Sequence, residues 1–410
     1  MRVYASASGS ISTSLGDNIY IQDAQLEKSL VATDVIETGA STAQSGILED
    51  LPRLDYSGGA SCPALLLEPS RTNVVENSEY QSSAIYNNDR VSIADNVAIS
   101  PEGLQNAAKI ILDSGINTSN GGHYYSLAST AGTNYTISVF AKAGEMRYFT
   151  FTYGSSSAGG GHFDLQEGTL LGVITNSQYS SESAFIEDYG NGWYRLIVSL
   201  TDGSNNSGRR LSMKPSPSAS VPPNNSYQST GDGVSGAYIY GIQLEAGNFS
   251  TSYIPTYGSA VTRSVDVADG VTIDTTANHT LLYDFDGTTG RETSTALFNI
   301  GYDNSNFYFI KGTSTSSPQF QIRGNGVFSG SISLTNEVSG RNKIAVQWID
   351  GTGYVYSNGV KQSGTLTNTS SANDIDYYKF EGRGYSHKVN QLLIFNTPLT
   401  DSECIALTTI

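Results

Sequence analysis

The chain has 410 residues, more than one ordinary domain contains, which predicts two or three domains. Lysine and arginine number 22 against 38 aspartates and glutamates, so the formal net charge is −16. This charge excludes a nucleic-acid-binding protein, because a phosphate backbone requires a positive surface. No apolar run approaches the ~20 residues of a membrane-spanning helix, so we expect no membrane insertion.

The N-terminal residues include an arginine but no apolar stretch behind it, so they do not form a secretory signal. The two cysteines, Cys62 and Cys404, lie almost a chain length apart. This spacing argues against a disulfide framework and predicts two buried thiols. We therefore expect a protein that is made in a reducing cytoplasm and is released without the classical export route.

Strand-like alternation is the dominant pattern along the chain, and helical periodicity is scarce. The predicted strands cover residues 134–142, 193–200, 279–285, 306–310, 319–322, 343–348, 354–356 and 390–395. Asp350-Gly351-Thr352-Gly353 has the composition of a hairpin turn between two of them. Short strands separated by Gly, Asn and Ser turns predict an all-β fold built from antiparallel sandwiches.

One helix is predicted near the C-terminus, where Thr400 and Glu403 fit a capping box. Cys404 and Leu407 would form its buried side, and we expect it to close a sandwich edge. The proline-rich run 212–226 is interpreted as a long loop inside a domain. Sharper seams fall at residues 52–63 and 254–266, which are rich in turn residues.

Two short segments that lie far apart in the first part of the chain have similar sequences. Residues 20–27 (YIQDAQLE) resemble residues 238–245 (YIYGIQLE). If the likeness is real, the first 50 residues carry a closing strand without its own sheet, and that strand must pair with a neighbouring subunit or an assembly partner. Chance similarity over eight residues is the alternative.

Residues 52–78 (PRLDYSGGASCPALLLEPSRTNVVENS) resemble a segment of tailed-bacteriophage structural proteins that introduces a carbohydrate-binding-module-like jelly roll. After Val261 the chain resembles a concanavalin A-like, laminin-G-like sandwich. The matching pieces are residues 135–145, 163–168, 191–195, 239–245 and 251–256 for the first module, and 343–364 and 389–406 for the second.

This resemblance implies an N-terminal attachment segment (1–60), a carbohydrate-binding-module-like jelly roll (61–260) and a concanavalin A-like domain (261–410). It also implies a protein of the phage virion surface, either a tail fibre or a short appendage, that is made in the host cytoplasm. Its expected partners are other virion proteins and a host cell-surface glycan. Relatives of this kind are homo-oligomers and often trimers. A head fibre or capsid decoration protein with a purely structural role is the alternative.

Trp193 and Arg195 are the candidate glycan-binding residues, since both point away from the predicted core face of their strand. Sugars stack their C–H faces on aromatic rings and bond their hydroxyls to polar side chains such as arginine. The alternative is that Trp193 packs under a loop or against a neighbouring domain, as most tryptophans are largely buried. Asp284 and Asp286 are weak candidates for calcium ligands, and a hairpin turn is the alternative for that segment.

Catalytic patterns are poor. The histidines fit no metal-binding spacing, so we expect no cofactor other than calcium. Carboxylate pairs such as Asp164 and Glu167 are too ordinary to indicate a glycosidase. The sequence therefore predicts a non-enzymatic binding protein, with a polysaccharide depolymerase as a weaker alternative.

Overall fold

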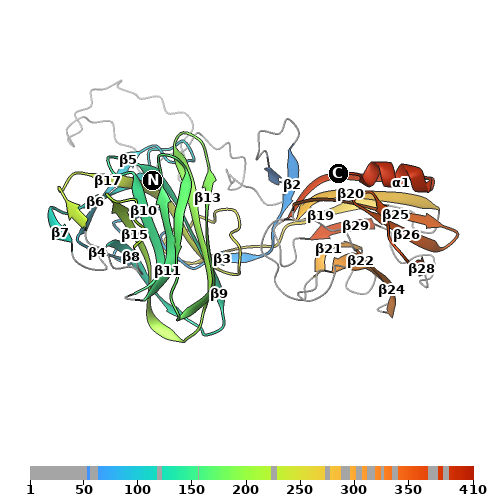
Figure 1. Ribbon diagram of the computed structural model, residues 1–410, viewed down its shortest axis with the longest axis horizontal. Coiled ribbons are helices and arrows are strands. Elements are labelled where there is room, and N and C mark those ends of the chain that lie inside the picture. The colour runs from blue at the N-terminus through green and yellow to red at the C-terminus, as the bar shows by residue number, and fades with distance from the viewer. Residues whose placement is uncertain are drawn as a thin grey trace, which may run out of the picture.

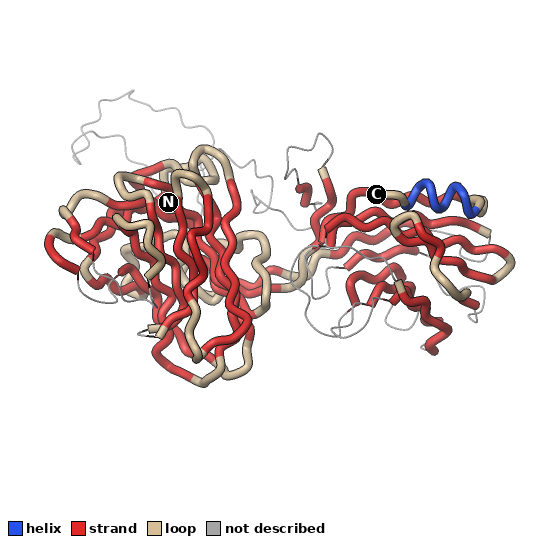
Figure 2. The backbone as a smooth tube through the Cα atoms, viewed as in Figure 1, coloured by secondary structure: helices blue, strands red, loops and turns tan. Residues whose placement is uncertain are grey.

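The computed structural model describes residues 53–55, 63–117, 122–155, 157–222, 229–272, 278–287, 296–301, 307–311, 319–324, 327–334, 340–367, 377–381 and 387–410. The expected attachment segment, apart from residues 53–55, lies outside these ranges, as do the 20–27 repeat and Cys62. The described residues form an all-β protein with two β-rich lobes joined by a narrow connection (Figures 1 and 2). No helix among them is long and apolar enough to cross a bilayer.

The first lobe is a sandwich of two antiparallel sheets, each with six strands in the described residues. We name them the β9 sheet and the β10 sheet. In spatial order the β9 sheet contains β13 (Tyr179–Asp188), β14 (Trp193–Asp202), β9 (Asn134–Ala143), β17 (Gly236–Ala246), β6 (Ala107–Leu112) and β5 (Val91–Ala98). The β10 sheet contains β12 (Thr169–Ile174), β11 (Ala158–Asp164), β10 (Tyr148–Gly154), β15 (Asn206–Ser216), β8 (Gly122–Ser129) and β4 (Tyr86–Asp89).

The core of this sandwich lies between the two sheets and is formed by alternate residues of each strand. Val139 and Leu196 come from the β9 sheet, and Phe149, Phe151 and Met213 come from the β10 sheet. All five are buried. The alternation predicted for residues 134–142 and 193–200 is therefore confirmed.

The second lobe is also a sandwich. Its β20 sheet contains β1 (Arg53–Asp55), β2 (Ala64–Leu67), β30 (His387–Phe395), β20 (His279–Gly287), β25 (Gly340–Ile349), β26 (Thr352–Ser357), β27 (Val360–Lys361) and β28 (Leu366–Thr367). Facing it is a sheet of β21 (Ala296–Gly301), β22 (Phe307–Lys311), β23 (Gln319–Gly324) and β24 (Val327–Ser333). Trp348, Tyr283 and Phe320 are buried between the two sheets.

Short strand pairs complete the described fold, and α1 lies on the second sandwich. The pairs are β7 (Gly115–Asn117) with β16 (Ser229–Gly231), β3 (Arg71–Asn73) with β18 (Val261–Arg263), and β19 (Val267–Thr272) with β29 (Tyr377–Glu381). Helix α1 (Asp401–Thr408) begins at the predicted capping box, and both capping bonds between Thr400 and Glu403 are present. It packs Cys404 and Leu407 against Tyr356 on the outer face of the β20 sheet, so the expectation that it closes a sheet edge is wrong (Figure 1).

The predicted hairpin is confirmed, and two expectations about the chain's organisation are corrected. Asp350 and Gly351 both have positive φ (49° and 75°), as a tight turn between β25 and β26 requires. The run that we expected to be a loop starts inside β15, which continues to Ser216. Strand β2 pairs with β30, so residues 64–67 belong to the sheet of the second sandwich, although we expected the jelly roll to start at residue 61.

Candidate functional site

Trp193 lies where the strand pattern places it, but it is not at the surface. Its side chain is 2% exposed and packs with Phe140 and Tyr240 on the outer face of the β9 sheet. The indole Nε1 donates a hydrogen bond to the Ile99 carbonyl at 3.0 Å. The expectation of an exposed ring for sugar stacking is therefore wrong, and the alternative that Trp193 packs under a loop is confirmed.

Arg195 is on the same face and is 3% exposed. Its Nη2 donates to the Ser138 hydroxyl at 3.0 Å and to the Thr251 carbonyl at 2.7 Å. Thr251 belongs to the segment by which the chain leaves the first sandwich, so Arg195 fixes that segment across the sheet. Arg195 therefore serves the fold and offers no surface to a sugar.

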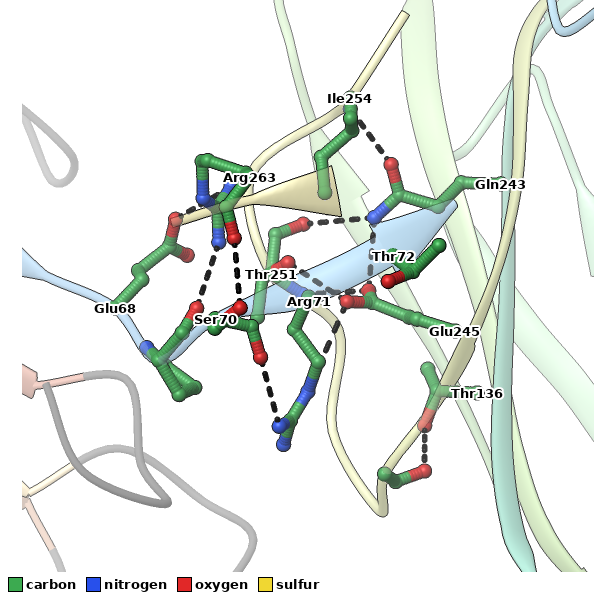
Figure 3. A network of polar contacts seen from close by, with 12 residues as sticks. Glu68, Ser70, Arg71, Thr72, Thr136, Gln243, Glu245, Thr251, Ile254 and Arg263 are labelled. Carbon is green, nitrogen blue, oxygen red and sulfur yellow. Dashed lines mark hydrogen bonds and ion pairs between the residues drawn. The ribbon is translucent and has the colours of Figure 1, made fainter. Parts of the chain in front are cut away.

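Residues of the 52–78 segment form an ion-pair network with residues 263–266, of which Figure 3 shows the pair of Glu68 and Arg263. Glu68 is 3% exposed and accepts bonds from Arg53 at 2.6 Å and from the Ser252 backbone at 2.8 Å. Arg263 lies 3.1 Å from the same carboxylate, and Asp266 binds both Arg53 and the Glu68 backbone N–H. This junction network holds the incoming and outgoing chain segments side by side.

A second carboxylate in Figure 3, Glu245 on β17, is also buried. It accepts bonds from Gln243 at 2.8 Å and from the backbone and hydroxyl of Thr251 at 2.8 and 2.7 Å. The Arg71 guanidinium lies 4.0 Å from it. The sequence motifs that carry the resemblance in this region thus hold together the segments by which the chain enters and leaves the first sandwich.

Glu79 is a third buried carboxylate, and it contacts the segment by which the chain leaves the first sandwich. The hydroxyls of Tyr240, Tyr253 and Tyr257 donate to it at 3.0, 3.3 and 3.1 Å. Burial, and to a lesser extent the nearby charge of Glu102, raise the pKa of Glu79 from 4.5 to about 7, although the tyrosine hydrogen bonds lower it. Glu79 therefore titrates near neutral pH.

Asp284 and Asp286 lie within β20, so the segment that we considered as a calcium-binding loop or a hairpin turn is a strand. The Asp284 carboxylate is 1% exposed, and Arg341 binds both of its oxygens at 2.9 and 2.6 Å. Within the described ranges no three His, Cys, Asp or Glu side chains converge as a metal site would need. The Asp284 carboxylate is therefore already paired with Arg341.

The strongest candidate for a binding surface is on the outer face of the β10 sheet, where β4, β8 and β15 lie next to one another (Figure 1). Asn87 is opposite Tyr124, and Ser126 is opposite Arg210. Paired residues of neighbouring strands share a face, and so do alternate residues of one strand, so these four side chains form one surface. Asn87 and Ser126 are exposed, and Tyr124 and Arg210 are half-buried. We call these four residues the Tyr124 surface.

Arg210 is unusual in having no polar partner. Its guanidinium carbon lies 4.3 Å from the centre of the Tyr124 ring, a cation–π contact. Every other arginine side chain that the structure describes binds a carboxylate, a carbonyl or a hydroxyl oxygen. Arg210 therefore presents unused N–H donors beside an aromatic ring.

Two hydroxyl groups lie on the same face of the β10 sheet as Tyr124, on the neighbouring strands β15 and β10. Ser212 is opposite Tyr124 on one side and Thr152 on the other. Both side chains are at least 97% buried, and neither hydroxyl has a hydrogen-bond partner. Most buried polar groups are hydrogen-bonded, so these two unpartnered hydroxyls are an unusual feature next to the Tyr124 surface.

Two basic side chains lie on this face of β15 although the chain as a whole is acidic. Lys214 follows Arg210 and Ser212 on the same face of β15 and is almost fully buried, which lowers its pKa to about 8. Asp89 and Arg90 are its nearest charged neighbours, and they have opposite signs. Arg210 and Lys214 thus lie on either side of Ser212 along this face of β15.

The sequence contained no local signal for this surface. Tyr124 and Arg210 come from separate strands, and only the register between β8 and β15 brings them together. Half-buried tyrosines and arginines are common in the chain, so neither residue stands out alone.

Comparisons with known proteins return only distant likenesses. No protein-family model matches the chain, and no curated protein matches it. Among solved structures, the sialidase module CBM40 of Ruminococcus gnavus bound to α2,3-sialyllactose has 15% identity and a TM-score of 0.27, covering 33% of this chain and 83% of its own. The mouse laminin α1 domains LG4-5 have 9% identity and a TM-score of 0.23, covering 70% and 96%. TM-scores this low support no conclusion about function.

Proposed function

We propose that this protein is a surface component of a tailed-phage virion that binds host glycans through the Tyr124 surface, without catalysis. The order of motifs from residue 52 to residue 406 supports the virion assignment through the resemblance described above. We further propose that the chain acts as a homo-oligomer, which light scattering of the purified protein tests.

The observation that carries glycan binding is the unpaired Arg210 over the half-buried ring of Tyr124. A sugar ring has an apolar face that packs on an aromatic or guanidinium plane, and its hydroxyls need donors and acceptors around that plane. Asn87 and Ser126 supply both at the rim of the surface. The hydroxyls of Ser212 and Thr152 lie behind it without partners.

A glycan array and binding to host cells test this proposal with the variant Tyr124→Ala. Loss of the ring should weaken glycan binding by at least about tenfold, because removal of a stacking contact costs about 1.4 kcal/mol or more. Thermal unfolding should remain close to that of the wild-type protein, since Tyr124 is only half-buried.

Tyr148→Ala is the matched control. Tyr148 is also half-buried on the β10 sheet and also lies under an arginine, Arg147. Arg147, however, is bound by Asp164 through three hydrogen bonds, so it has no free donors of the kind Arg210 has. Equal losses for the two variants would overturn the assignment to the Tyr124 surface, and so would undiminished binding by Tyr124→Ala.

The depolymerase alternative predicts release of reducing sugar from host polysaccharide. Retained binding without such release supports a non-enzymatic role, and turnover would overturn it.

A head fibre or decoration protein remains a second candidate because the first sandwich also exposes apolar side chains elsewhere. Ile99 is 63% exposed next to Trp193, and Tyr189 is 47% exposed against Phe140. Such side chains suit contact with another protein. Antibody-gold microscopy of virions separates the two candidates, since label on the head together with absent glycan binding would favour the structural role.

A further inference from the structure

The charge at the Tyr124 surface narrows the class of saccharide, provided that the proposed glycan binding is correct. We propose that this surface selects acidic saccharides, whose carboxylate the Arg210 guanidinium binds.

The first step is the missing partner of Arg210. Acidic residues outnumber basic ones by 38 to 22, and among the arginine side chains that the structure describes only Arg210 lacks a polar partner. A half-buried guanidinium has lost part of its hydration, and an anion that binds it restores the lost hydrogen bonds.

The second step is preorganisation. The Tyr124 ring, 4.3 Å from the guanidinium carbon, restricts where the Arg210 side chain lies. A planar guanidinium that is already held in place can bind a carboxylate through two parallel N–H bonds with little further loss of side-chain entropy.

The third step is the surrounding charge. Lys214 lies four residues beyond Arg210 on the same face of β15, and Asp89 is ion-paired with Arg90. The groups facing the site therefore favour an anion over a neutral sugar.

The experiment compares polygalacturonate, hyaluronan and polysialic acid, each with its carboxyl methyl ester, in equilibrium binding to the full chain. The ester keeps the sugar and removes its charge. We expect at least one acidic polymer to bind about tenfold to a hundredfold more tightly than its ester, as for hydrogen bonds to charged groups. We expect this preference to weaken as salt rises.

Arg210→Gln should reduce the acidic polymer to the affinity of its ester, and Arg210→Lys should retain part of the preference. Arg147→Gln is the matched control, because Arg147 directly precedes β10 and is half-buried like Arg210, but it is already paired with Asp164 and Glu167. We expect it to leave the preference unchanged.

Equal binding of acid and ester, or a preference that survives Arg210→Gln, would overturn acidic selectivity and leave glycan binding intact. Absence of binding to these polymers and to every neutral member of a glycan array would overturn the proposed function itself.

Discussion

Replacement of Glu79 by glutamine should remove a loss of stability that the first sandwich undergoes as the pH rises. The wild-type carboxyl accepts bonds from Tyr240, Tyr253 and Tyr257 in a site that is almost closed to solvent. Glutamine keeps an oxygen that accepts these bonds but carries no charge at any pH.

The magnitude follows from the shift of the Glu79 pKa from 4.5 to about 7. A raised pKa means that the folded state binds the proton more tightly than the unfolded state does. The stabilisation is therefore complete below pH 4.5 and is lost as the pH rises to about 7. At 1.36 kcal/mol per pH unit, the free energy of unfolding falls by about 3 kcal/mol over this range.

Urea unfolding of both proteins from pH 4.5 to 8 tests this value. The two tryptophans lie in different sandwiches, so a Trp348→Phe background makes Trp193 the fluorescent reporter of the first one. The free energy of Glu79→Gln minus that of the wild type should rise by about 3 kcal/mol with pH. Glu102→Gln should move this rise to lower pH, because the Glu102 charge helps to raise the Glu79 pKa. A difference that stays constant with pH would refute the reasoning.

Two further predictions concern Trp193 and the junction network around Glu68. Trp193→Phe should lower the free energy of unfolding by about 1 kcal/mol through loss of the hydrogen bond to Ile99, with glycan binding unchanged; a selective loss of binding would show that Trp193 contacts sugar after all. Glu68→Gln should lower it by about 3 kcal/mol or more, because two arginines then lose their buried carboxylate. The exposed pair Lys361–Asp401 is the control, and Lys361→Met should cost less than about 1 kcal/mol in the same urea titration. Equal costs for these two variants would contradict the structural role of the junction network.

Local patterns were sufficient to predict much of the fold. The alternation around Trp193 identified which side chains of its strand face the core and which face away from it. The capping residues Thr400 and Glu403 identified the start of α1. These features depend on neighbours in sequence, so they are visible without coordinates.

Features that depend on long-range contacts could not be predicted. Arg195 points away from the core but is covered by the segment that contains Thr251, which lies far along the chain. The side chain of Arg195 was therefore mistaken for an exposed one. Asp284 was considered as a calcium ligand because nothing nearby in the sequence reveals its partner Arg341 on β25. Strand β2 joins the sheet of the second sandwich for the same reason, since its partner β30 is near the other end of the chain.

A crystal structure of the protein with a bound acidic oligosaccharide tests the central claim most directly. We predict a sugar carboxylate within hydrogen-bonding distance of Arg210 and a sugar ring packed beside Tyr124. A saccharide bound at another surface, such as the exposed side chains of Ile99 and Tyr189, would contradict the assignment.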